Sequence, residues 1–442
     1  MKQTGLIWFN NDLRVHDNPA LLEASLHCQR LICLFCFDSQ WSRPTGLNAR
    51  PLGEIRHQFL NQSLMDLSEQ LARRGQSLIV VSCDPVAEIS DLIRRFKVEA
   101  LYRSDHVGVY ENRQWQHLKA DFPRLAFVSV SSHTLFRPEQ LPFTLSALPN
   151  SFSRFRRQVE ALDIDPPLMM PRELPAPVEA LTEESQGFAV ASKEQNLFEG
   201  GEQAALAQLE SYFSSDRPAH YKHWRNELDG WSNSTKFSPW LANGNLSVRR
   251  LLKRLRDFEQ DQVANESTYW IYFELLWREY FQWVAKKLRH KLFSANGVSK
   301  QKKQCCFYPE RYQKWCHGNT PYPLVNALMN QLNQTGYMSN RGRQIVASCL
   351  VNELQLDWRF GAAYFEQQLI DYDVASNWGN WQYIAGVGMD PRGGRHFNID
   401  KQTRQFDPEG RFIRDWQGEV TTPQLDSVDA ADWPILPGKP TQ

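Results

Sequence analysis

Short hydrophobic runs alternate with helical patterns over the first 130 positions of the chain. The runs lie at residues 6–9, 31–37, 78–81, 100–102 and 126–130. After the second run, apolar residues recur at the spacing of one helix face: Ile55, Phe59, Leu60, Leu64, Leu67 and Leu71. This alternation predicts a doubly wound α/β domain with a parallel sheet between helices. No Gly-x-Gly-x-x-Gly follows any run, so an ordinary dinucleotide site is not expected there.

Residues 131 to about 200 follow neither pattern, and eight prolines fall between residues 138 and 177. A proline-rich connection of this length is uncommon inside a compact domain. It is expected to cross the surface between two domains, with one short helix near 152–162. The basic cluster on that helix predicts a solvated face, with nucleic-acid contact as the alternative: Arg154, Arg156 and Arg157.

From residue 201 the hydrophobic spacing becomes helical. Apolar residues from Ala205 to Phe213 form one amphipathic face, and those from Leu251 to Phe258 form another. Few strand-like alternations follow, so this part predicts an all-α domain. The expected division is an α/β domain over 1–130, a linker over 131–200, an all-α domain over 201–416 and a tail over 417–442.

Composition adds bounds to this picture. Hydrophobic residues make up 42% and charged residues 23% of 442 positions, as in globular proteins, and the 50 basic residues balance the 50 acidic ones. The chain shows no signal segment and no apolar run long enough to span a bilayer, so a cytoplasmic protein without membrane contact is expected. The eight cysteines are irregularly spaced, which favours reduced thiols. Cys33 and Cys36 lie in a predicted strand and should point to opposite faces.

Tryptophan is the unusual residue, because 12 of the 15 copies lie at or after residue 224. The densest polar and aromatic segment is Asp371-Tyr-Asp-Val-Ala-Ser-Asn-Trp-Gly-Asn-Trp-Gln-Tyr383, in which Gly379 is expected to relax the backbone. Hydrogen-bonding groups among large rings predict the wall of a pocket for a flat, partly polar ligand. An aromatic core with incidental polar groups is the alternative.

A second candidate segment starts at Thr235. Thr235 and Ser238 precede Pro239, a pattern typical of a helix start. Hydroxyl and amide groups gather there at the positive end of a helix dipole, which favours phosphate. A plain capping device is the alternative.

A third segment is a helix expected from Tyr269 to Lys287. Glu274 and Arg278 stand four residues apart on it, beside Trp277 and Phe281. One interpretation is an ion pair within the helix. The other is a polar function in a pocket framed by the two rings.

A fourth segment follows Met338. Asn340, Arg341 and Arg343 precede an apolar helix expected over 345–356, which Asp357-Trp358-Arg359 is expected to end. Arginines placed just before a buried helix suit anionic oxygens.

Several motifs together resemble the photolyase/cryptochrome family. Trp8-Phe-Asn-Asn-Asp-Leu-Arg14 and Asp17-Asn-Pro-Ala-Leu21 are similar to its opening signature, with Asn10 where arginine is common. The segments from Ala385 to Asp400 and from Phe406 to Gly410 resemble the DASH cryptochromes. The resemblance covers about residues 5 to 416 and includes the segments described above.

The resemblance implies FAD, bound in a bent shape inside the all-α domain. The matching motifs assign the phosphates to Tyr221, Thr235, Lys236, Phe237 and Ser238. They place along the cofactor Trp270, Glu274 and Arg278. They place around the flavin ring Asn340, Arg343, Asp371, Asp373 and Asn377, the last facing N5.

The resemblance further implies an electron relay from the surface to the flavin through Trp315, Trp358 and Trp381. The expected reaction is light-driven splitting of a cyclobutane pyrimidine dimer by an electron from reduced FAD. Glu274 would contact the dimer, and Trp277 and Asn340 would lie on either side of the extruded bases. Base extrusion costs a few kcal/mol, and stacking returns roughly 1–3 kcal/mol per base.

Two positions depart from the duplex-specific enzymes of the family. Tyr383 stands where those enzymes have a second tryptophan, and Gln344 where methionine is common. A more polar pocket loses roughly 1 kcal/mol of apolar contact, which is comparable to the margin for base extrusion. The expected substrate is therefore a dimer in single-stranded DNA, as is typical of DASH proteins, with RNA or a looped duplex as further candidates.

The resemblance also implies a folate antenna such as 5,10-methenyltetrahydrofolate between the two domains, with Glu111 as the candidate contact. The protein is expected to be a monomer. Two alternatives stay open: a blue-light photoreceptor that signals through its flavin, and a nucleic-acid binder. The binder would use a basic face around the pocket: Lys302, Lys303, Arg311, Arg341, Arg343, Arg392, Arg395, Lys401 and Arg404.

Overall fold

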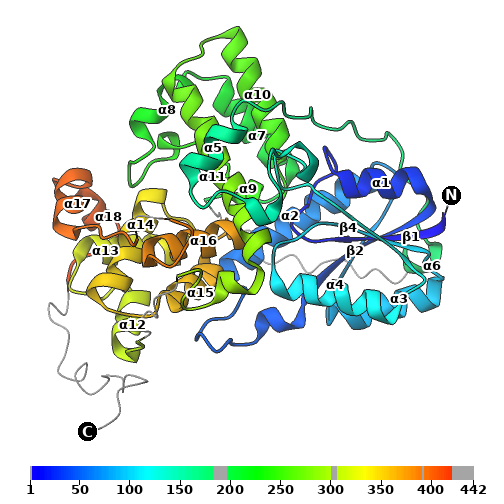
Figure 1. Ribbon diagram of the computed structural model, residues 1–442, viewed down its shortest axis with the longest axis horizontal. Helices are drawn as coiled ribbons and strands as arrows, with labels where there is room; N and C mark the ends of the chain where they lie inside the picture. Colours follow the sequence, from blue (N-terminus) through cyan, green and yellow to red (C-terminus); the bar gives the residue numbers. More distant parts are fainter. Residues whose placement is uncertain (1, 183–196, 300–305, 391–392, 421–442) are drawn as a thin grey trace, which may run out of the picture.

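The structure is a computed structural model that describes residues 2–182, 197–299, 306–390 and 393–420. An α/β domain and a larger helical domain lie side by side, and the segment after the last strand runs between them (Figure 1). The expected basic residues Lys302, Lys303 and Arg392, and the tail from residue 421 onward, lie outside the described residues.

Each of the five predicted hydrophobic runs is a strand, and all neighbouring strands pair in parallel. The order across the sheet is β3-β2-β1-β4-β5. Their bounds are β1 Lys2–Phe9, β2 Cys28–Asp38, β3 Leu78–Cys83, β4 Ala100–Ser104 and β5 Ala126–Val130. The parallel sheet of the prediction is confirmed.

Helices cover both faces of this sheet. Helices α1 (Pro19–His27) and α2 (Glu54–Ala72) bury their apolar sides on one face, while α3 (Pro85–Phe96) and α4 (Val109–Asp121) cover the other. Cys33 belongs to the first core and Cys36 to the second, so their side chains point to opposite faces as expected. Burial raises the pKa of Cys33, which suits a structural thiol.

The crossing segment after residue 130 is partly core, which corrects the expectation of a surface path. It forms η2 (Pro138–Gln140), η3 (Leu145–Ala147), α5 (Phe152–Val159) and α6 (Glu179–Thr182). Leu135, Phe136 and Phe155 are buried in the helical core. Hydrogen bonds as well as apolar packing hold this segment in the core. The buried carboxylate of Glu279 accepts hydrogen bonds from the backbone N–H groups of Leu135 and Phe136, at 2.7 and 3.3 Å.

The basic cluster of helix α5 is only partly solvated. Arg154 and Arg157 are exposed, but Arg156 pairs with Glu160 at 3.4 Å and donates to the hydroxyl of Tyr269.

The helical domain is built around helix α11, which contacts α5, α8, α10 and α16. The helices of this domain are α7 Glu202–Phe213, α8 Arg217–Trp224, α9 Ser238–Ala242, α10 Val248–Asp261, α11 Glu266–Leu288, α12 Pro309–Cys316, α13 Pro323–Thr335, α14 Asn340–Ser348, α15 Trp358–Gln368, α16 Val374–Ala385, α17 Ile399–Phe406 and α18 Arg411–Asp415. Shorter turns are η1 Ser39–Ser42, η4 Trp231–Asn233, η5 Arg289–Phe293 and η6 Cys349–Glu353.

Three local predictions were wrong. The helix expected over 345–356 is divided, because α14 ends at Ser348 and a π-helical turn follows. Asp357 does not end a helix but begins α15, since its carboxylate accepts the backbone N–H of Arg359. Gly379 does not relax the backbone either: it lies within α16, where a Cβ would meet the ring of Phe281 at 2.4 Å.

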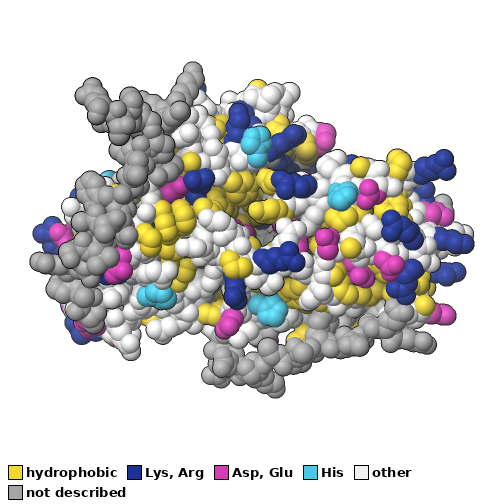
Figure 2. All heavy atoms as spheres, turned by 90° about the horizontal axis from the view of Figure 1, so that it is seen from below, with side chains coloured by type: hydrophobic (Ala, Val, Ile, Leu, Met, Phe, Trp, Pro, Cys, Tyr) yellow, Lys and Arg dark blue, Asp and Glu magenta, His cyan; other side chains and the backbone are white. Residues whose placement is uncertain are grey.

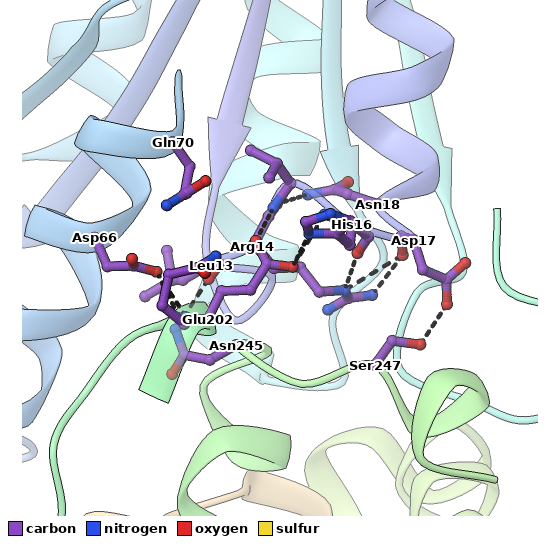
Figure 3. A network of polar contacts seen from close by, with 12 residues as sticks. Leu13, Arg14, His16, Asp17, Asn18, Asp66, Gln70, Glu202, Asn245 and Ser247 are labelled. Atoms are coloured by element: carbon purple, nitrogen blue, oxygen red, sulfur yellow. Dashed lines mark hydrogen bonds and ion pairs between the residues drawn. The ribbon is translucent and has the colours of Figure 1, made fainter. Parts of the chain in front are cut away.

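The opening motif proves to be the junction between the domains (Figure 3). Arg14 is buried and donates to backbone carbonyls of Gly244 at 2.8 Å, Asp17 at 2.9 Å and Ser132 at 3.2 Å. Gly244 has φ of +71°, and a Cβ there would lie 1.8 Å from a backbone oxygen of Asn11. Only glycine permits this close approach of the two backbones. The charged groups of the opening motif are buried because they bind groups of both domains at the junction.

Charges of both signs are interspersed on the face seen from below, with hydrophobic side chains between them (Figure 2). Three members of the expected basic face are already engaged: Arg343 with Asp371, Arg395 with Asp390, and Arg341 over the rings of Phe397 and Phe406. None of the helices in the described ranges is long and apolar enough to cross a membrane.

Candidate functional site

A cavity of about 450 Å³ opens between helices α8, α9, α11, α14 and α16. A smaller cavity of about 90 Å³ adjoins it and shares its polar lining along α14 and α16. Most of the predicted cofactor and substrate residues line the two cavities: Tyr221, Thr235, Lys236, Phe237, Ser238, Trp270, Glu274, Trp277, Arg278, Asn340, Arg343, Gln344, Asp371, Asp373, Asn377, Trp381 and Tyr383. Tyr221 and Tyr383, which are 162 positions apart in sequence, therefore face one space.

One end of the larger cavity is formed by the turn before α9. Ser238 and Pro239 begin that helix, as the sequence predicted. Lys236 adopts a left-handed conformation with φ of +59° and is buried, and its Nζ lies 4.7 Å from the ring centroid of Tyr337. Burial lowers the pKa of Lys236 to about 8. A buried ammonium facing a cavity favours an anionic ligand.

Helix α11 supplies the long wall of the cavity. Glu274 does not pair with Arg278, so the ion pair within the helix is not formed. Its carboxylate pairs instead with Arg225 at the end of α8, and that guanidinium lies 4.3 Å from the ring centroid of Trp270. Burial raises the pKa of Glu274, and Arg225 opposes that rise.

Arg278 lines the same cavity but is committed to the linker. Its guanidinium donates to the backbone carbonyl of His133 and, at 3.4 Å, to that of Leu241. Burial, and secondly Arg278, lowers the pKa of His133 well below the ordinary value. Arg278 therefore ties the crossing segment to the wall of the site.

The polar floor is an ion pair between Arg343 of α14 and Asp371, with Nη2 and Oδ2 2.7 Å apart. Arg343 engages only one oxygen, and Oδ1 of Asp371 is buried without a hydrogen-bond partner. Asp373 caps α16 by accepting the backbone N–H of Ser376 at 2.7 Å, and its other oxygen accepts from Gln282 at 2.8 Å. Asp371 thus offers an unused acceptor to a ligand with N–H or O–H groups.

Asn377 lines only the smaller cavity. Its Nδ2 donates to the carbonyl of Ala362 at 3.0 Å, which fixes the orientation of the amide. Asn340 is the first residue of α14 and borders both cavities, together with Gln344 one turn later.

Aromatic side chains of α11 and α16 also line the larger cavity. The ring of Trp277 stacks on Phe152 of the linker, with centroids 3.8 Å apart, and lies 6.1 Å from the ring of Tyr383. The hydroxyl of Tyr383 accepts two hydrogen bonds from Arg395, at 2.9 and 3.1 Å, and Arg395 pairs with Asp390. Tyr383 is therefore a hydrogen-bonded ring held from outside the pocket.

The three relay tryptophans are all buried, with exposed fractions of 0% for Trp315 and 2% for Trp358 and Trp381. This corrects the expectation that they run from the surface. Trp381 and Trp315 are in contact, with centroids 6.2 Å apart, whereas Trp358 packs on Trp378 at 5.8 Å. The half-buried Tyr364 lies 5.6 Å from Trp315. Any relay through Trp315 needs a further group to reach solvent.

A third cavity of about 350 Å³ lies between the α/β domain and helices α15 and α16. Glu111 borders it, as predicted, beside His106 at 3.5 Å and with the guanidinium of Arg56 on the same lining. His106, and to a lesser extent Arg103, lowers the pKa of Glu111 against the effect of burial. The loop that the family resemblance assigned to an antenna chromophore therefore borders a cavity between the domains.

Sequence reasoning missed three residues of the site. Arg225, which neutralises Glu274, has no motif around it, and Arg395 was assigned only to a surface patch. The ring centroid of Tyr337 lies 4.7 Å from Nζ of Lys236 and 5.5 Å from Cζ of Arg343, and burial raises the pKa of Tyr337 to about 12. Tyr337 directly precedes the segment Met338–Gln344, and that proximity was a signal that could have pointed to it.

Two family models match the chain. DNA photolyase matches residues 5–177, and the FAD binding domain of DNA photolyase matches residues 270–434. A cryptochrome DASH of Idiomarina loihiensis is 51% identical over 98% of this chain and 96% of its own length, and one of Vibrio parahaemolyticus is 48% identical over 98% of both. The crystal structure of a Synechocystis cryptochrome superposes with a TM-score of 0.85, at 38% identity over 94% of this chain and 89% of that one.

The chain therefore belongs to the photolyase family, and within it to the DASH cryptochromes. Its helical domain is an FAD-binding domain. The residues present fit that cofactor, because the buried ammonium of Lys236 and an unpartnered carboxylate oxygen of Asp371 both border the cavity. The turn before α9 would hold the diphosphate, and Asn340, Arg343, Asp371, Asp373 and Asn377 would surround the flavin.

Proposed function

We propose that this protein uses blue light and FAD to split cyclobutane pyrimidine dimers, preferentially in single-stranded DNA, as a monomer. The observation that carries the proposal is the shared cavity. The aromatic wall of Trp277 and Tyr383 opens on the same space as the Arg343–Asp371 pair. A flat substrate can thus lie against the aromatic wall while the cofactor occupies the polar floor.

Bound FAD supplies the light absorption and the transferable electron. The protein supplies the surroundings of the substrate. The ring of Trp277 is fixed by its stack on Phe152. Binding of an extruded base against it therefore carries little entropic cost for ordering this side chain. Glu274, one turn earlier on α11, borders the same cavity and pairs with Arg225, and its carboxyl group would contact a dimer carbonyl or imide edge.

Preference for single strands follows from Tyr383 and Gln344. A phenol held by Arg395 and a carboxamide replace apolar contact on the substrate side. Losing a few tens of Å² of apolar contact costs about 1 kcal/mol, close to the margin available for extruding bases from a duplex. An unpaired strand does not bear the extrusion cost, so it retains binding.

The decisive test compares dimer repair in single-stranded and duplex oligonucleotides of one sequence, under blue light and reducing conditions. Faster repair of the single strand supports the proposal. Equal rates would refute the selectivity, and no repair of either, with intact flavin photoreduction, would favour the photoreceptor alternative.

Reduction of the bound cofactor is proposed to pass through Trp381 and Trp315 to Tyr364. These three rings are in successive contact, and Tyr364 is the partly exposed member. Its hydroxyl donates to Asn333 at 2.6 Å, which keeps the ring beside Trp315. Trp358, in contact with Trp378, would serve a second branch.

The cavity between the domains is proposed to hold a folate antenna of the 5,10-methenyltetrahydrofolate type. Its lining combines flat rings with carboxyl and guanidinium groups, including Trp41, Trp378, Glu111 and Arg56. Glu111, with His106 fixing its position, would accept hydrogen bonds from a pterin edge. An absorption band in the near ultraviolet that Glu111→Ala abolishes, with FAD retained, would test it.

A further inference from the structure

A fourth cavity, of about 890 Å³, lies away from the sites described above. It is bordered by the end of α2, by α7 and α10, and by residues 166–172 of the crossing segment. The fourth cavity shares no lining residue with the three other cavities. Its lining consists of His16, Gln70, Arg73, Arg74, Pro166, Pro167, Leu168, Met169, Met170, Pro171, Arg172, Leu209, Glu210, Arg250, Lys253, Arg254 and Asp257.

The lining is strongly basic, although the whole chain is neutral. Six lysine and arginine side chains face two carboxylates. The two carboxylates are already paired, Glu210 with Arg254 at 3.2 Å and Asp257 with Lys253 at 2.8 Å. Positive charge is therefore left over around Arg74, Arg172 and Arg250, which come from three separate elements.

Another part of the lining is apolar. It consists of Pro166, Pro167, Leu168, Met169 and Met170, and the side chain of Met169 is 89% exposed. The backbone N–H of Leu168 donates to the buried carboxylate of Asp17 at 2.8 Å, which anchors this wall to the domain junction. A methionine so exposed is an adaptable contact surface for an apolar or aromatic group.

We infer that this cleft binds a compact polyanion with a flat apolar end, which is the chemistry of a nucleoside di- or triphosphate. The guanidiniums of Arg172 and Arg250 suit bidentate contact with phosphate oxygens. The Pro-Met wall suits the face of a base. The carboxylates of Glu210 and Asp257 border the same space, which disfavours a long phosphate backbone crossing it and favours a ligand of nucleotide size.

The test measures binding of ATP, inorganic triphosphate and adenosine to the FAD-loaded protein by calorimetry, at low and at physiological salt. ATP is expected to bind more tightly than triphosphate, and adenosine least. Arg172→Gln and Arg250→Gln should each weaken ATP binding by at least about tenfold, since each removes one charge-assisted contact. Arg124→Gln, an exposed arginine between α4 and β5, is the matched control and should change nothing.

The flavin spectrum and thermal unfolding of each variant show whether it is folded. ATP binding that is equal in all three variants would overturn the inference, because the nucleotide would then occupy another cavity. So would a result in which a short oligothymidylate, and not ATP, loses binding in Arg172→Gln and Arg250→Gln. That outcome would make the cleft a nucleic-acid surface.

Discussion

Asp17 of the α/β domain and Arg249 of helix α10 form a buried ion pair, with Oδ1 and Nη2 2.6 Å apart and side-chain exposures of 1% and 9%. Asp17 also accepts from the hydroxyl of Ser247 (Figure 3) and from the backbone N–H of Leu168. One carboxylate thus joins both domains and the crossing segment. Together with Arg14, which donates to Gly244 and Ser132, this pair holds the two domains in place.

Asp17→Asn is expected to lower the free energy of unfolding by about 3–5 kcal/mol, since it leaves the Arg249 guanidinium buried without a counter-charge. Urea denaturation followed by circular dichroism measures this. The matched control is Asp91→Asn, which breaks an exposed pair with Arg95 and should cost less than about 1 kcal/mol. Equal losses of unfolding free energy in the two variants would show that the Asp17–Arg249 pair does not stabilise the domain junction.

FAD binding should weaken in alkaline solution because of Lys236. Burial lowers its pKa to about 8 in the free protein, and a bound diphosphate favours the charged form. Binding then takes up a proton above pH 8, so affinity falls by up to about tenfold per pH unit as pH rises. Reconstitution of the apoprotein at pH 7 and 9.5 measures the fall. Lys236→Met should bind FAD more weakly at pH 7 and show a flatter profile; an unchanged slope would contradict the assignment.

Tyr383→Trp is expected to raise duplex repair relative to single-strand repair by about fivefold, the equivalent of roughly 1 kcal/mol of added apolar contact. The indole cannot accept the hydrogen bonds of Arg395, so Tyr383→Phe separates loss of the hydroxyl from gain of area. Tyr269→Trp, on the exposed side of α11, is the control. The ratio of the two repair rates is the readout, and a ratio unmoved by Tyr383→Trp would refute the argument.

Photoreduction of the flavin should distinguish the two branches of the relay. Trp381→Phe is expected to abolish it, and Trp315→Phe and Tyr364→Phe to slow it more than Trp358→Phe does. The reason is that Trp315 contacts both Trp381 and Tyr364. Trp283→Phe, a buried indole bound to Glu279 at 2.7 Å, controls for loss of packing. A larger effect of Trp358→Phe would instead assign the main path to Trp378.

Stability should fall between pH 5 and 8 because of Glu366, on the lining of the cavity between the domains. Burial raises its pKa from 4.5 to about 7 against the opposing charge of Arg56. The proton that the folded state retains stabilises it below pH 4.5, and this contribution, up to about 3 kcal/mol, is lost as pH rises through 7. Thermal unfolding across this range should show a smaller pH slope in Glu366→Gln than in the unmodified protein. Loss of the negative charge near Arg56 adds a cost that does not vary with pH and so leaves this comparison of slopes unaffected.

The local pattern was sufficient for elements whose burial repeats along the chain. The five strands and the amphipathic helices α2, α7 and α10 follow from periodicity, because one face of each must be removed from water. The helix start at Ser238 was also readable, since proline is favoured in the first turn of a helix, whereas α14 begins at Asn340, five residues before the expected start. The family motifs predicted polar residues around one ligand, and Tyr221, Lys236 and Asp371 line one cavity.

Long-range partners were not readable, because nothing local to a residue states which distant group neutralises it. Glu274 pairs with Arg225 and not with Arg278, and the carboxylate of Glu279 fixes a segment 144 positions earlier. Burial of Trp315 depends on packing of α12 against other helices, so its sequence could not show that it stops short of the surface. Sequence by itself determined the fold class, the family and the inventory of polar and aromatic groups. Tertiary structure alone decided the ion-pair partners, the exposed end of the relay and the basic cleft, since each depends on how separate elements pack.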